Sequence, residues 1–370
     1  MIITIAPDSF KSYLTSIQAT NIISLALKAN NRKNTIYPLP LSDGGEGSLE
    51  VFCHYNQCKI HSKKSTDPLG NKLSYPYAIC SPKNIGFIES AKVIGYELIP
   101  QPLDSPQIAS SFGLGKALKD LFDDYPHLTW YLALGGTATI DGGKDALSGL
   151  GLDLQNSKGE KPKLGGGTLA DLDSIGPKSK IVDLSKHKVK LVCDVKNPLL
   201  GSNGATRIYG PQKGVRARDI EMFEAGFINL AEVLKKSIGS FVDQPSYGAA
   251  GGIPATFNNL FNWPLIDGSN FFASISQLEN KIKDSDLVIT GEGRLDSQTF
   301  NGKLVDKVIR AAGKHKSRIL IVAGTASNDL PKLPPEIEIE LLRPPGSKLP
   351  QNKVQVKEEL LTKIANKFNL

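Results

Sequence analysis

The chain has 370 residues, of which 40% are hydrophobic, and it carries a formal net charge of +7 at pH 7. This is enough apolar material for a large core and for more than one domain. No apolar stretch reaches the roughly 20 residues of a membrane-spanning helix, and the first residues lack the basic and long apolar regions of a signal peptide. We therefore expect a cytoplasmic protein without a membrane partner.

The distribution of charge and cysteine excludes further classes. The lysines are scattered and form no long basic block, and no RNP motif, zinc finger or basic zipper is present, which argues against a nucleic-acid partner. A lysine-rich surface still attracts small anions weakly. The four cysteines show no CxxC spacing, so we expect free thiols in a reducing compartment rather than disulfides or structural zinc.

The first eighty residues predict the start of a doubly wound parallel sheet. Ile2–Ile5 is a short apolar strand, and Thr15 and Gln18 form a capping box that begins a helix. Thr35–Pro40 is a second strand, followed by a glycine loop and another helix. This β-loop-α-β-loop-α order is typical of α/β proteins.

An antiparallel meander follows. The strands Lys59–Thr66 and Lys72–Cys80 flank a reverse turn at Asp67–Gly70, and Ile85–Glu89 continues the meander after a second turn. Further along the chain, the pattern predicts two more strands and a long amphipathic helix, at Leu128–Leu134, Lys188–Val195 and Ala217–Ile238.

The parallel pattern returns at the end of the chain. Strands are expected at Leu287–Thr290, Arg318–Ala323 and Ile337–Leu342, and helices at Lys303–Ala312 and Val354–Phe368. The simplest arrangement is a discontinuous α/β domain of residues 1–80 and 284–370, with residues 81–283 inserted as a second α/β domain. We expect the active site in the cleft between the two domains.

Six segments combine glycine with charged or hydroxyl side chains. They are APDSFK (6–11), SDGGEG (42–47), GGTATIDGG (135–143), YGPQKG (209–214), YGAAGG (247–252) and TGEGRLD (290–296). A loop of this kind after a parallel strand lies at the carboxyl edge of the sheet, where free backbone N–H groups suit an anion. Any one of them could be an ordinary tight turn, but six together favour a site for a polyanion.

The isolated charges in these loops fit phosphoryl transfer better than other chemistries. There is no Walker loop, GxGxxG fingerprint, GxSxG elbow or HExxH motif, and the histidines lie outside the loops. Mg²⁺ needs only one or two protein carboxylates beside substrate phosphates. Lys11 and Lys213 are the best cationic candidates. Asp8 and Asp43 could instead cap the following turn or helix, and Lys213 could be a surface lysine.

Several motifs together resemble the bacterial type I glycerate kinases. They occur in the order found in that family and cover residues 3 to about 303: APDSFKSYLT, LPLSDGGEGS, TDPLG, IGFIESA, LALGGTATIDGG, CDVKNPLLGSNGATRIYGPQKG, YGAAGG and DLVITGEGRLDSQTFNGK. The first motif of the family usually has glycine where this chain has Ser12, which restricts the backbone there.

The resemblance implies a flavodoxin-like domain with a parallel sheet, a second domain with a mixed sheet, and phosphorylation of D-glycerate to 2-phosphoglycerate by ATP with Mg²⁺. The protein would be a monomer or a homodimer. A glycerate 3-kinase, or a kinase of another small hydroxy acid, would use the same loops. A non-catalytic regulator that binds metabolites is a third alternative.

The motif positions of the family identify the candidate site residues in this sequence. We expect Asp43, Asp194, Lys11 and Lys213 to be catalytic, with Mg²⁺ held by Asp194 or Asp43. Polar motif positions also fall on Asp141 and Lys303. The residues expected to bind substrate or phosphate are Asp8, Ser9, Gly44, Gly45, Glu46, Gly135, Gly136, Thr137, Asn197, Gln212, Glu292 and Asp296.

Overall fold

The structure is a computed structural model that describes residues 1–10, 13–100, 106–297, 299–300, 302–347 and 352–368. The chain forms two compact units. One unit contains Met1–Tyr55 and Asp267–Leu370, and we call it the flavodoxin-like unit. The other contains Asn56–Ile266, and we call it the mixed-sheet unit.

The flavodoxin-like unit is built on a parallel sheet. Within the described residues its strand order is β13-β12-β11-β1-β2, and every pair of neighbours is parallel. Read from β2, this is the 2-1-3-4-5 order of flavodoxin-like folds. The strands are β1 (Ile2–Ile5), β2 (Thr35–Pro38), β11 (Leu287–Leu295), β12 (Arg318–Ala326) and β13 (Ile337–Leu341).

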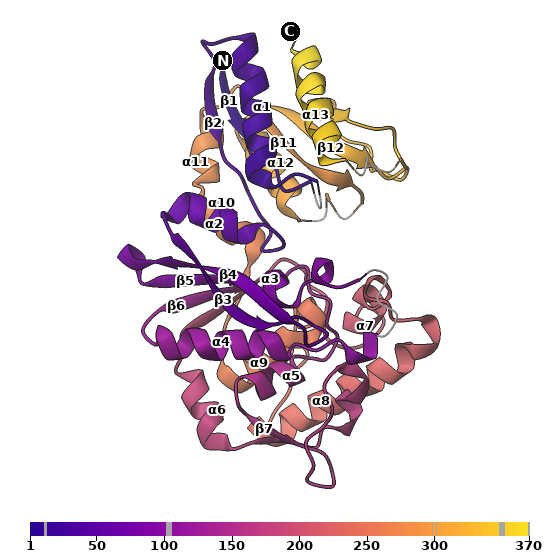
Figure 1. The fold of residues 1–370 in the computed structure, drawn as a ribbon. Helices are drawn as coiled ribbons and strands as arrows, with labels where there is room; N and C mark the ends of the chain where they lie inside the picture. Colours follow the sequence, from indigo (N-terminus) through magenta and orange to yellow (C-terminus); the bar gives the residue numbers. More distant parts are fainter. Residues whose placement is uncertain (11–12, 101–105, 298, 301, 348–351, 369–370) are drawn as a thin grey trace. The chain divides into compact units, whose positions relative to one another are not determined.

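Helices cover both faces of this sheet. Helices α1 (Ser16–Asn30) and α13 (Lys353–Lys367) pack side by side on one face, where their apolar residues meet Ile3, Ile5 and Leu320 (Figure 1). The other face is covered by α11 (Leu278–Lys283) and α12 (Leu304–Lys314). The unit also contains α2 (Ser48–Asn56) and α10 (Gly268–Ile275). Because both faces are buried, the interior strand β12 is continuous in apolar residues from Ile319 to Ala323.

The capping box at the start of α1 is confirmed. The Thr15 side chain accepts a hydrogen bond from the Gln18 backbone N–H at 3.2 Å, and Gln18 Oε1 accepts one from the Thr15 N–H at 3.0 Å. These contacts pair two backbone donors that the first turn of a helix leaves unsatisfied.

The mixed-sheet unit contains a sheet with the described strand order β10-β9-β6-β5-β4-β3. Neighbours β3–β4 and β4–β5 are antiparallel, whereas β5, β6 and β9 run parallel. A separate antiparallel pair is formed by β7 and β8. The strands are β3 (Lys59–Thr66), β4 (Lys72–Cys80), β5 (Ile85–Glu89), β6 (Thr129–Ala133), β7 (Asp153–Gln155), β8 (Ser174–Gly176), β9 (Val189–Cys193) and β10 (Leu265–Asp267).

The helices of this unit enclose one large core, which contains Trp130, Trp263 and Phe227. They are α3 (Ala91–Ile94), α4 (Phe112–Asp124), α5 (Lys144–Gly149), α6 (Lys178–Ser185), α7 (Ala205–Tyr209), α8 (Ile220–Ile238) and α9 (Ile253–Phe261). Helix α8 begins three residues after the expected Ala217, because Ala217–Asp219 forms a 3₁₀ turn.

The predicted α/β class, with one parallel and one mixed sheet, is confirmed. The expected domain boundaries near residues 80 and 284 differ from the division after Tyr55 and before Asp267. Strands β3 and β4 pair with β5 and so belong to the mixed-sheet unit. Helices α10 and α11 pack with α12 and so belong to the flavodoxin-like unit.

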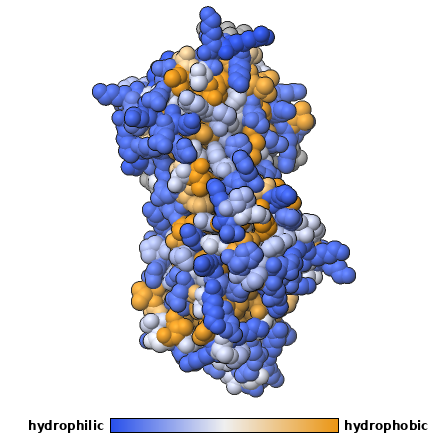
Figure 2. Space-filling view, turned by 90° about the vertical axis from the view of Figure 1, so that its left-hand side faces the viewer, coloured by the Kyte–Doolittle hydropathy of each residue, from blue (hydrophilic) through white to orange (hydrophobic). Residues whose placement is uncertain are grey.

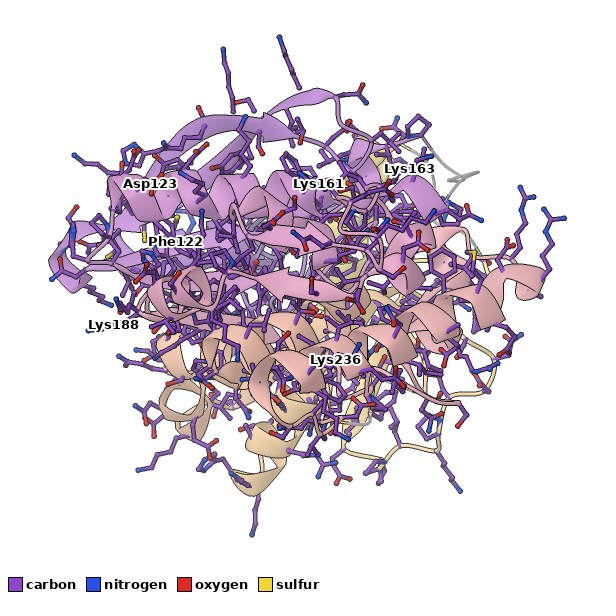
Figure 3. All side chains as sticks on the ribbon, turned by 90° about the horizontal axis from the view of Figure 1, so that it is seen from below. Phe122, Asp123, Lys161, Lys163, Lys188 and Lys236 are labelled. Carbon is purple, nitrogen blue, oxygen red and sulfur yellow. The ribbon has the colours of Figure 1, made fainter. Side chains whose placement is uncertain are left out.

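The surface is polar over most of the face that Figure 2 shows, with apolar residues scattered among charged ones. Figure 3 labels exposed lysines from different segments of the mixed-sheet unit, among them Lys161, Lys188 and Lys236. This agrees with the expected lysine-rich surface. None of the helices in the described part of the chain has the length and apolar character needed to cross a membrane.

Candidate active site

The carboxyl edge of the parallel sheet carries the first group of candidate residues. In the 2-1-3-4-5 order, ligands bind where the chain connections diverge, which here is between β1 and β11. Asp8 follows β1, and its backbone N–H donates to the carbonyl of Gly291 in β11 at 2.8 Å. The Asp8 Oδ1 atom accepts a hydrogen bond from the Ser9 N–H at 2.6 Å. Asp8 and Ser9 therefore lie where a flavodoxin-like fold places its ligand.

The SDGGEG loop lies at the same edge, after β2. Asp43 Oδ1 accepts a hydrogen bond from the Gly45 N–H at 2.8 Å, while among the described residues its other oxygen, Oδ2, receives none. Gly44 and Gly47 have φ angles of 90° and 86°, which favour glycine, so these two residues make the sharp bend. The Asp43 carboxylate is thus fixed by its own loop, with one oxygen available.

Glu292 and Asp296 are brought together by Thr299, which the sequence analysis did not select. The Thr299 hydroxyl donates to Glu292 Oε1 at 2.7 Å, and the Thr299 N–H donates to Asp296 Oδ1 at 3.1 Å. The signal for this contact was the Asp296-x-x-Thr299 spacing, which resembles a cap. The prediction that TGEGRLD forms a loop is wrong, because most of this segment extends β11 and pairs with β12. The glycine at position 291 is explained by packing, since a Cβ there would lie 1.7 Å from the Val322 carbonyl oxygen.

Three strand ends meet at the carboxyl edge of the parallel part of the mixed sheet. They are the ends of β5, β6 and β9. Strand β5 closes with Glu89 and is followed by Ser90, β6 is followed by the GGTAT loop (135–139), and β9 is followed by Asp194. Glu89 was missed because it closes an apolar strand. Its side chain is fully buried, and an oxygen lies 4.0 Å from the Lys92 ammonium.

Lys213 is buried and contacts the GGTAT loop. Its Nζ atom donates to Thr137 Oγ1 at 3.2 Å and to the Thr139 carbonyl oxygen at 2.8 Å. Burial lowers the pKa of Lys213 to about 7, while the carboxylate of Asp141 acts in the opposite direction. Lys213 is therefore not the surface lysine that the sequence left open.

Two other residues of the same motif region differ in exposure. Gln212 is exposed. Asn197 is held by the protein at both ends of its amide, because Nδ2 donates to the Asn203 carbonyl at 2.9 Å and Oδ1 accepts from the Tyr209 hydroxyl at 2.5 Å. These contacts hold the Asn197 side chain in the loop after β9, and its expected role in binding stays a prediction.

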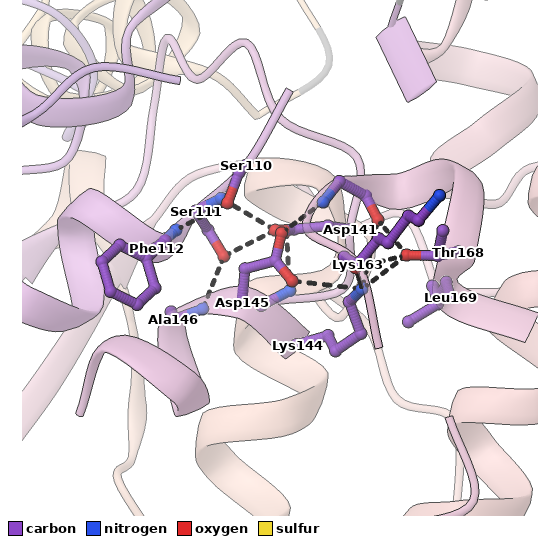
Figure 4. Close-up of polar contacts among 12 residues, drawn as sticks. Ser110, Ser111, Phe112, Asp141, Lys144, Asp145, Ala146, Lys163, Thr168 and Leu169 are labelled. Carbon is purple, nitrogen blue, oxygen red and sulfur yellow. Dashed lines mark hydrogen bonds and ion pairs between the residues drawn. The ribbon is translucent and has the colours of Figure 1, made fainter. Parts of the chain in front are cut away.

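A network of buried charges surrounds Asp141 (Figure 4). Asp141 Oδ2 accepts from the N–H and the hydroxyl of Ser111, both at 2.8 Å, and Oδ1 accepts from the Gly143 N–H at 3.1 Å. Burial, and then the neighbouring Asp145, raises the pKa of Asp141 to about 7. Both oxygens of Asp141 therefore have partners inside the unit.

Lys144 holds the segment from Lys163 to Thr168 in the same network. Its Nζ atom donates to the carbonyl oxygens of Lys163 and Gly165 at 2.8 and 3.2 Å and to Thr168 Oγ1 at 2.9 Å, and it lies 3.1 Å from Asp145 Oδ1. The partners found for the Lys144 ammonium among the described residues are all protein oxygens, so we interpret the network as structural.

The glycines of YGAAGG serve packing. A Cβ on Gly251 would lie 2.1 Å from the Thr139 carbonyl oxygen, and one on Gly248 would lie 2.3 Å from the Pro198 carbonyl oxygen. The Gly142 N–H donates to the Gly251 carbonyl at 2.9 Å. This segment therefore approaches neighbouring backbone, which is a different reason for glycine from the expected approach of a ligand.

The remaining candidates stay predictions. Lys11 and Ser12 lie outside the described residues. Glu46, Asp194 and Lys303 are described, and each has interactions within the protein. Among the described residues, no group of three or more histidine, cysteine, aspartate or glutamate side chains could hold a metal ion.

Acids, hydroxyls and glycine loops at the carboxyl edges of parallel strands are features of α/β proteins that bind small anionic ligands. The sequence model of the glycerate kinase family matches residues 3–367. The chain belongs to this family, which is a family of phosphotransferases.

Individual relatives agree with this assignment. The chain is 34% identical over 331 residues to a glycerate 2-kinase of Escherichia coli strain K12, which covers 89% of this chain and 87% of the relative. It is 33% identical over 324 residues to a glycerate kinase of Halalkalibacterium halodurans, covering 87% and 85%. A crystal structure reported for glycerate kinase 2 of Salmonella typhimurium LT2 matches with a TM-score of 0.80 and 29% identity, over 100% of this chain and 97% of that one.

Proposed function

We propose that the protein transfers the γ-phosphoryl group of ATP to the 2-hydroxyl of D-glycerate, forming 2-phosphoglycerate and ADP. Membership of the glycerate kinase family supports the reaction class, and the E. coli relative named glycerate 2-kinase supports the position of transfer. The observation that carries the proposal is Asp43, whose Oδ2 atom is available at the carboxyl edge of the parallel sheet.

We assign to Asp43 the role of the carboxylate that accepts a hydrogen bond from the attacking hydroxyl. The hydroxyl of glycerate would donate a hydrogen bond to Asp43 Oδ2, and its proton would pass to the carboxylate late in the transfer. In a loose transition state the nucleophile needs orientation more than a strong base. The bond from the Gly45 N–H to Oδ1 fixes the orientation of the carboxylate.

Anchoring of the substrates requires donors. The carboxylate of glycerate would be bound by Lys11 or a neighbouring cation and by backbone N–H groups, and the phosphates of ATP would lie against the glycine loops. Asp8, Glu46, Glu292 and Asp296 would orient the ligands or bound water, since carboxylates accept hydrogen bonds from hydroxyls.

The donor set fits Mg²⁺. Asp43 and Asp194 offer hard carboxylate oxygens, and the described residues contain no larger cluster of metal-binding side chains. Mg²⁺ usually keeps several waters and binds through one or two carboxylates plus substrate phosphates, so one of these acids is enough. When bound, the ion would neutralise charge on the phosphate oxygens.

The proposal is tested by incubating the purified protein with ATP, Mg²⁺ and D-glycerate. ADP should form only when glycerate is present, and ³¹P NMR should identify the product as 2-phosphoglycerate. Reactions without glycerate, and with L-glycerate, are the controls. A 3-phosphoglycerate product would show that the phosphoryl group is transferred to the 3-hydroxyl instead of the 2-hydroxyl. Absence of ADP with a panel of short hydroxy acids would refute the proposed function.

A further inference from the structure

Lys213 and Thr137 form a buried contact between segments that lie 76 residues apart in the chain. The Lys213 Nζ atom donates to the Thr137 hydroxyl oxygen at 3.2 Å and to the Thr139 carbonyl oxygen at 2.8 Å. Lys213 is 4% exposed and Thr137 is 5% exposed. The 3₁₀ turn Pro211–Lys213 is thereby fastened to the loop that follows β6.

This contact leaves the hydroxyl hydrogen of Thr137 without a partner. An ammonium can only donate, so the Thr137 oxygen accepts and its own hydrogen remains available. Among the described residues, the hydrogen bond from Lys213 is the one found at the Thr137 hydroxyl. A buried polar hydrogen without an acceptor costs free energy, so a ligand oxygen at this position would be favoured.

A second pair of the same residue types provides a comparison inside the same unit. Thr168 Oγ1 also accepts from a buried lysine, Lys144, at 2.9 Å. Its hydrogen, however, is donated to the Lys163 carbonyl oxygen at 2.6 Å. The Lys144–Thr168 pair is therefore saturated within the protein, whereas the Lys213–Thr137 pair can still bind an acceptor.

The loop that carries Thr137 is fixed on both sides of this residue. The Gly136 carbonyl accepts from the Tyr96 N–H at 2.9 Å, and the Ala138 N–H donates to the Ile94 carbonyl at 2.9 Å. Because these bonds hold the backbone, the main freedom left to Thr137 is rotation of its side chain, and the bond from Lys213 restricts that rotation.

We propose that Lys213 is a positioning residue that orients the Thr137 hydroxyl to donate a hydrogen bond to an anionic oxygen of a bound substrate. The proposal rests on the proposed phosphorylation of glycerate by ATP, in which the carboxylate of one substrate and the phosphates of the other supply such oxygens. Thr137 follows β6 at the carboxyl edge of the parallel strands, where ligands bind in α/β folds.

The position of the ammonium favours this indirect role over direct contact with phosphate. Two of its three N–H groups are used by the GGTAT loop, and its side chain is almost fully buried. Burial lowers its pKa to about 7, so full positive charge is not guaranteed at neutral pH. What Lys213 supplies is therefore hydrogen-bond geometry, and it does so as the ammonium, because a neutral amine has a lone pair that could itself accept the Thr137 hydrogen.

The kinetic test compares wild type with Thr137→Val, Thr137→Ser, Lys213→Met and the Thr137→Val/Lys213→Met double variant. Loss of one hydrogen bond to a charged oxygen should lower kcat/KM about tenfold to a hundredfold in Thr137→Val, whereas Thr137→Ser should stay near wild type. The double variant should be no worse than the more damaging single variant, because both remove one interaction. A raised KM for glycerate would identify its carboxylate as the acceptor of the Thr137 hydrogen bond, and a raised KM for ATP would identify a phosphate as the acceptor.

Two results would overturn the proposal. One is kcat/KM of Thr137→Val within twofold of wild type. The other is additive losses in the double variant, which would mean that Lys213 acts on the substrate without Thr137. The matched control is Thr168→Val, whose hydroxyl is saturated: it should lower the melting temperature and leave both KM values unchanged.

A binding arm separates this proposal from the proposed function. Thermal shifts are measured with D-glycerate and with inorganic phosphate as probes, on wild type and Thr137→Val, and this requires no turnover. A shift in wild type that is lost in Thr137→Val supports the role of Thr137 even if no phosphoryl transfer is found. Equal shifts in the two proteins, or no shift in wild type, would contradict it.

Discussion

Two groups of charged residues lie in, or directly after, glycine loops of similar sequence, yet the structure gives them different environments. In the mixed-sheet unit, Asp141, Lys144 and Asp145 are fully buried, and protein groups satisfy their charges. In the flavodoxin-like unit, Asp43 is half-buried and its own loop satisfies one oxygen only. A charge in a glycine loop is therefore a candidate for ligand binding only where the fold leaves part of it without a protein partner.

The largest expected effect concerns the buried network. Lys144→Met should lower the free energy of unfolding of the mixed-sheet unit by about 3–5 kcal/mol, because it leaves the Asp145 carboxylate buried without its cation. Urea unfolding followed by tryptophan fluorescence measures this, since both tryptophans, Trp130 and Trp263, lie in this unit. Lys119→Met, which removes an exposed ion pair with Asp123, is the control and should cost at most about 0.5 kcal/mol. Similar losses in the two variants would contradict the comparison.

Asp43→Asn should have the opposite effect, a loss of activity without a loss of stability. The amide can still accept the hydrogen bond from Gly45, so the loop and the stability should be kept, while loss of the carboxylate should lower kcat by about a hundredfold or more. Steady-state kinetics and thermal melting measure the two effects. Asp286→Asn is the matched control, because Asp286 accepts the Ile2 N–H at 2.7 Å just before β11, at the other edge of the same sheet. Near-normal turnover of Asp43→Asn would remove Asp43 from catalysis.

The smallest of the three effects is a pH dependence at Lys213, a buried charge that is only partly satisfied. Its pKa in the folded protein is about 7, below the ordinary value of 10.5. Between these values the unfolded chain binds a proton that the folded chain does not, so stability rises with pH through this window. From pH 7 to pH 8, the unfolding free energy of wild type should rise by about 1 kcal/mol relative to Lys213→Met.

The measurement is urea unfolding of both proteins at each pH, followed by tryptophan fluorescence. Asp141, whose pKa is also about 7, titrates in both proteins, and for this reason only the difference between them is used. Parallel stability curves over pH 7–8 would show that Lys213 does not titrate there.

Much of the fold could be predicted, because its signals are local. The Thr15–Gln18 capping box, the strand Ile2–Ile5 and the β3–β4 turn depend on residues a few positions apart, and all three are confirmed. The extension of β11 could not be predicted in this way. The sequence predicts a loop at Gly291, Glu292 and Arg294. In the structure each of these residues pairs with a residue of β12, so the segment is part of the strand.

The site was predicted less completely than the fold, because a functional side chain is defined by its partners. The partners of Asp141, Asn197 and Lys213 lie 30, 6 and 76 residues away in the chain. Of these three contacts that of Asn197 is the nearest in sequence, and even that depends on how the loop after β9 folds. Thr299 and Glu89 were missed for other reasons: the partners of Thr299 lie only three and seven residues away but belong to a segment read as a loop, and Glu89 closes an apolar strand.

The sequence alone therefore determined the α/β class, the order of most strands and the family motifs, because strand patterns, caps and motifs are written in neighbouring residues. Only the tertiary structure decided which unit β3 and β4 join, which charges are saturated, and that Lys213 holds the GGTAT loop. Burial and hydrogen-bond partnership depend on the packing of distant segments, and no local pattern encodes them.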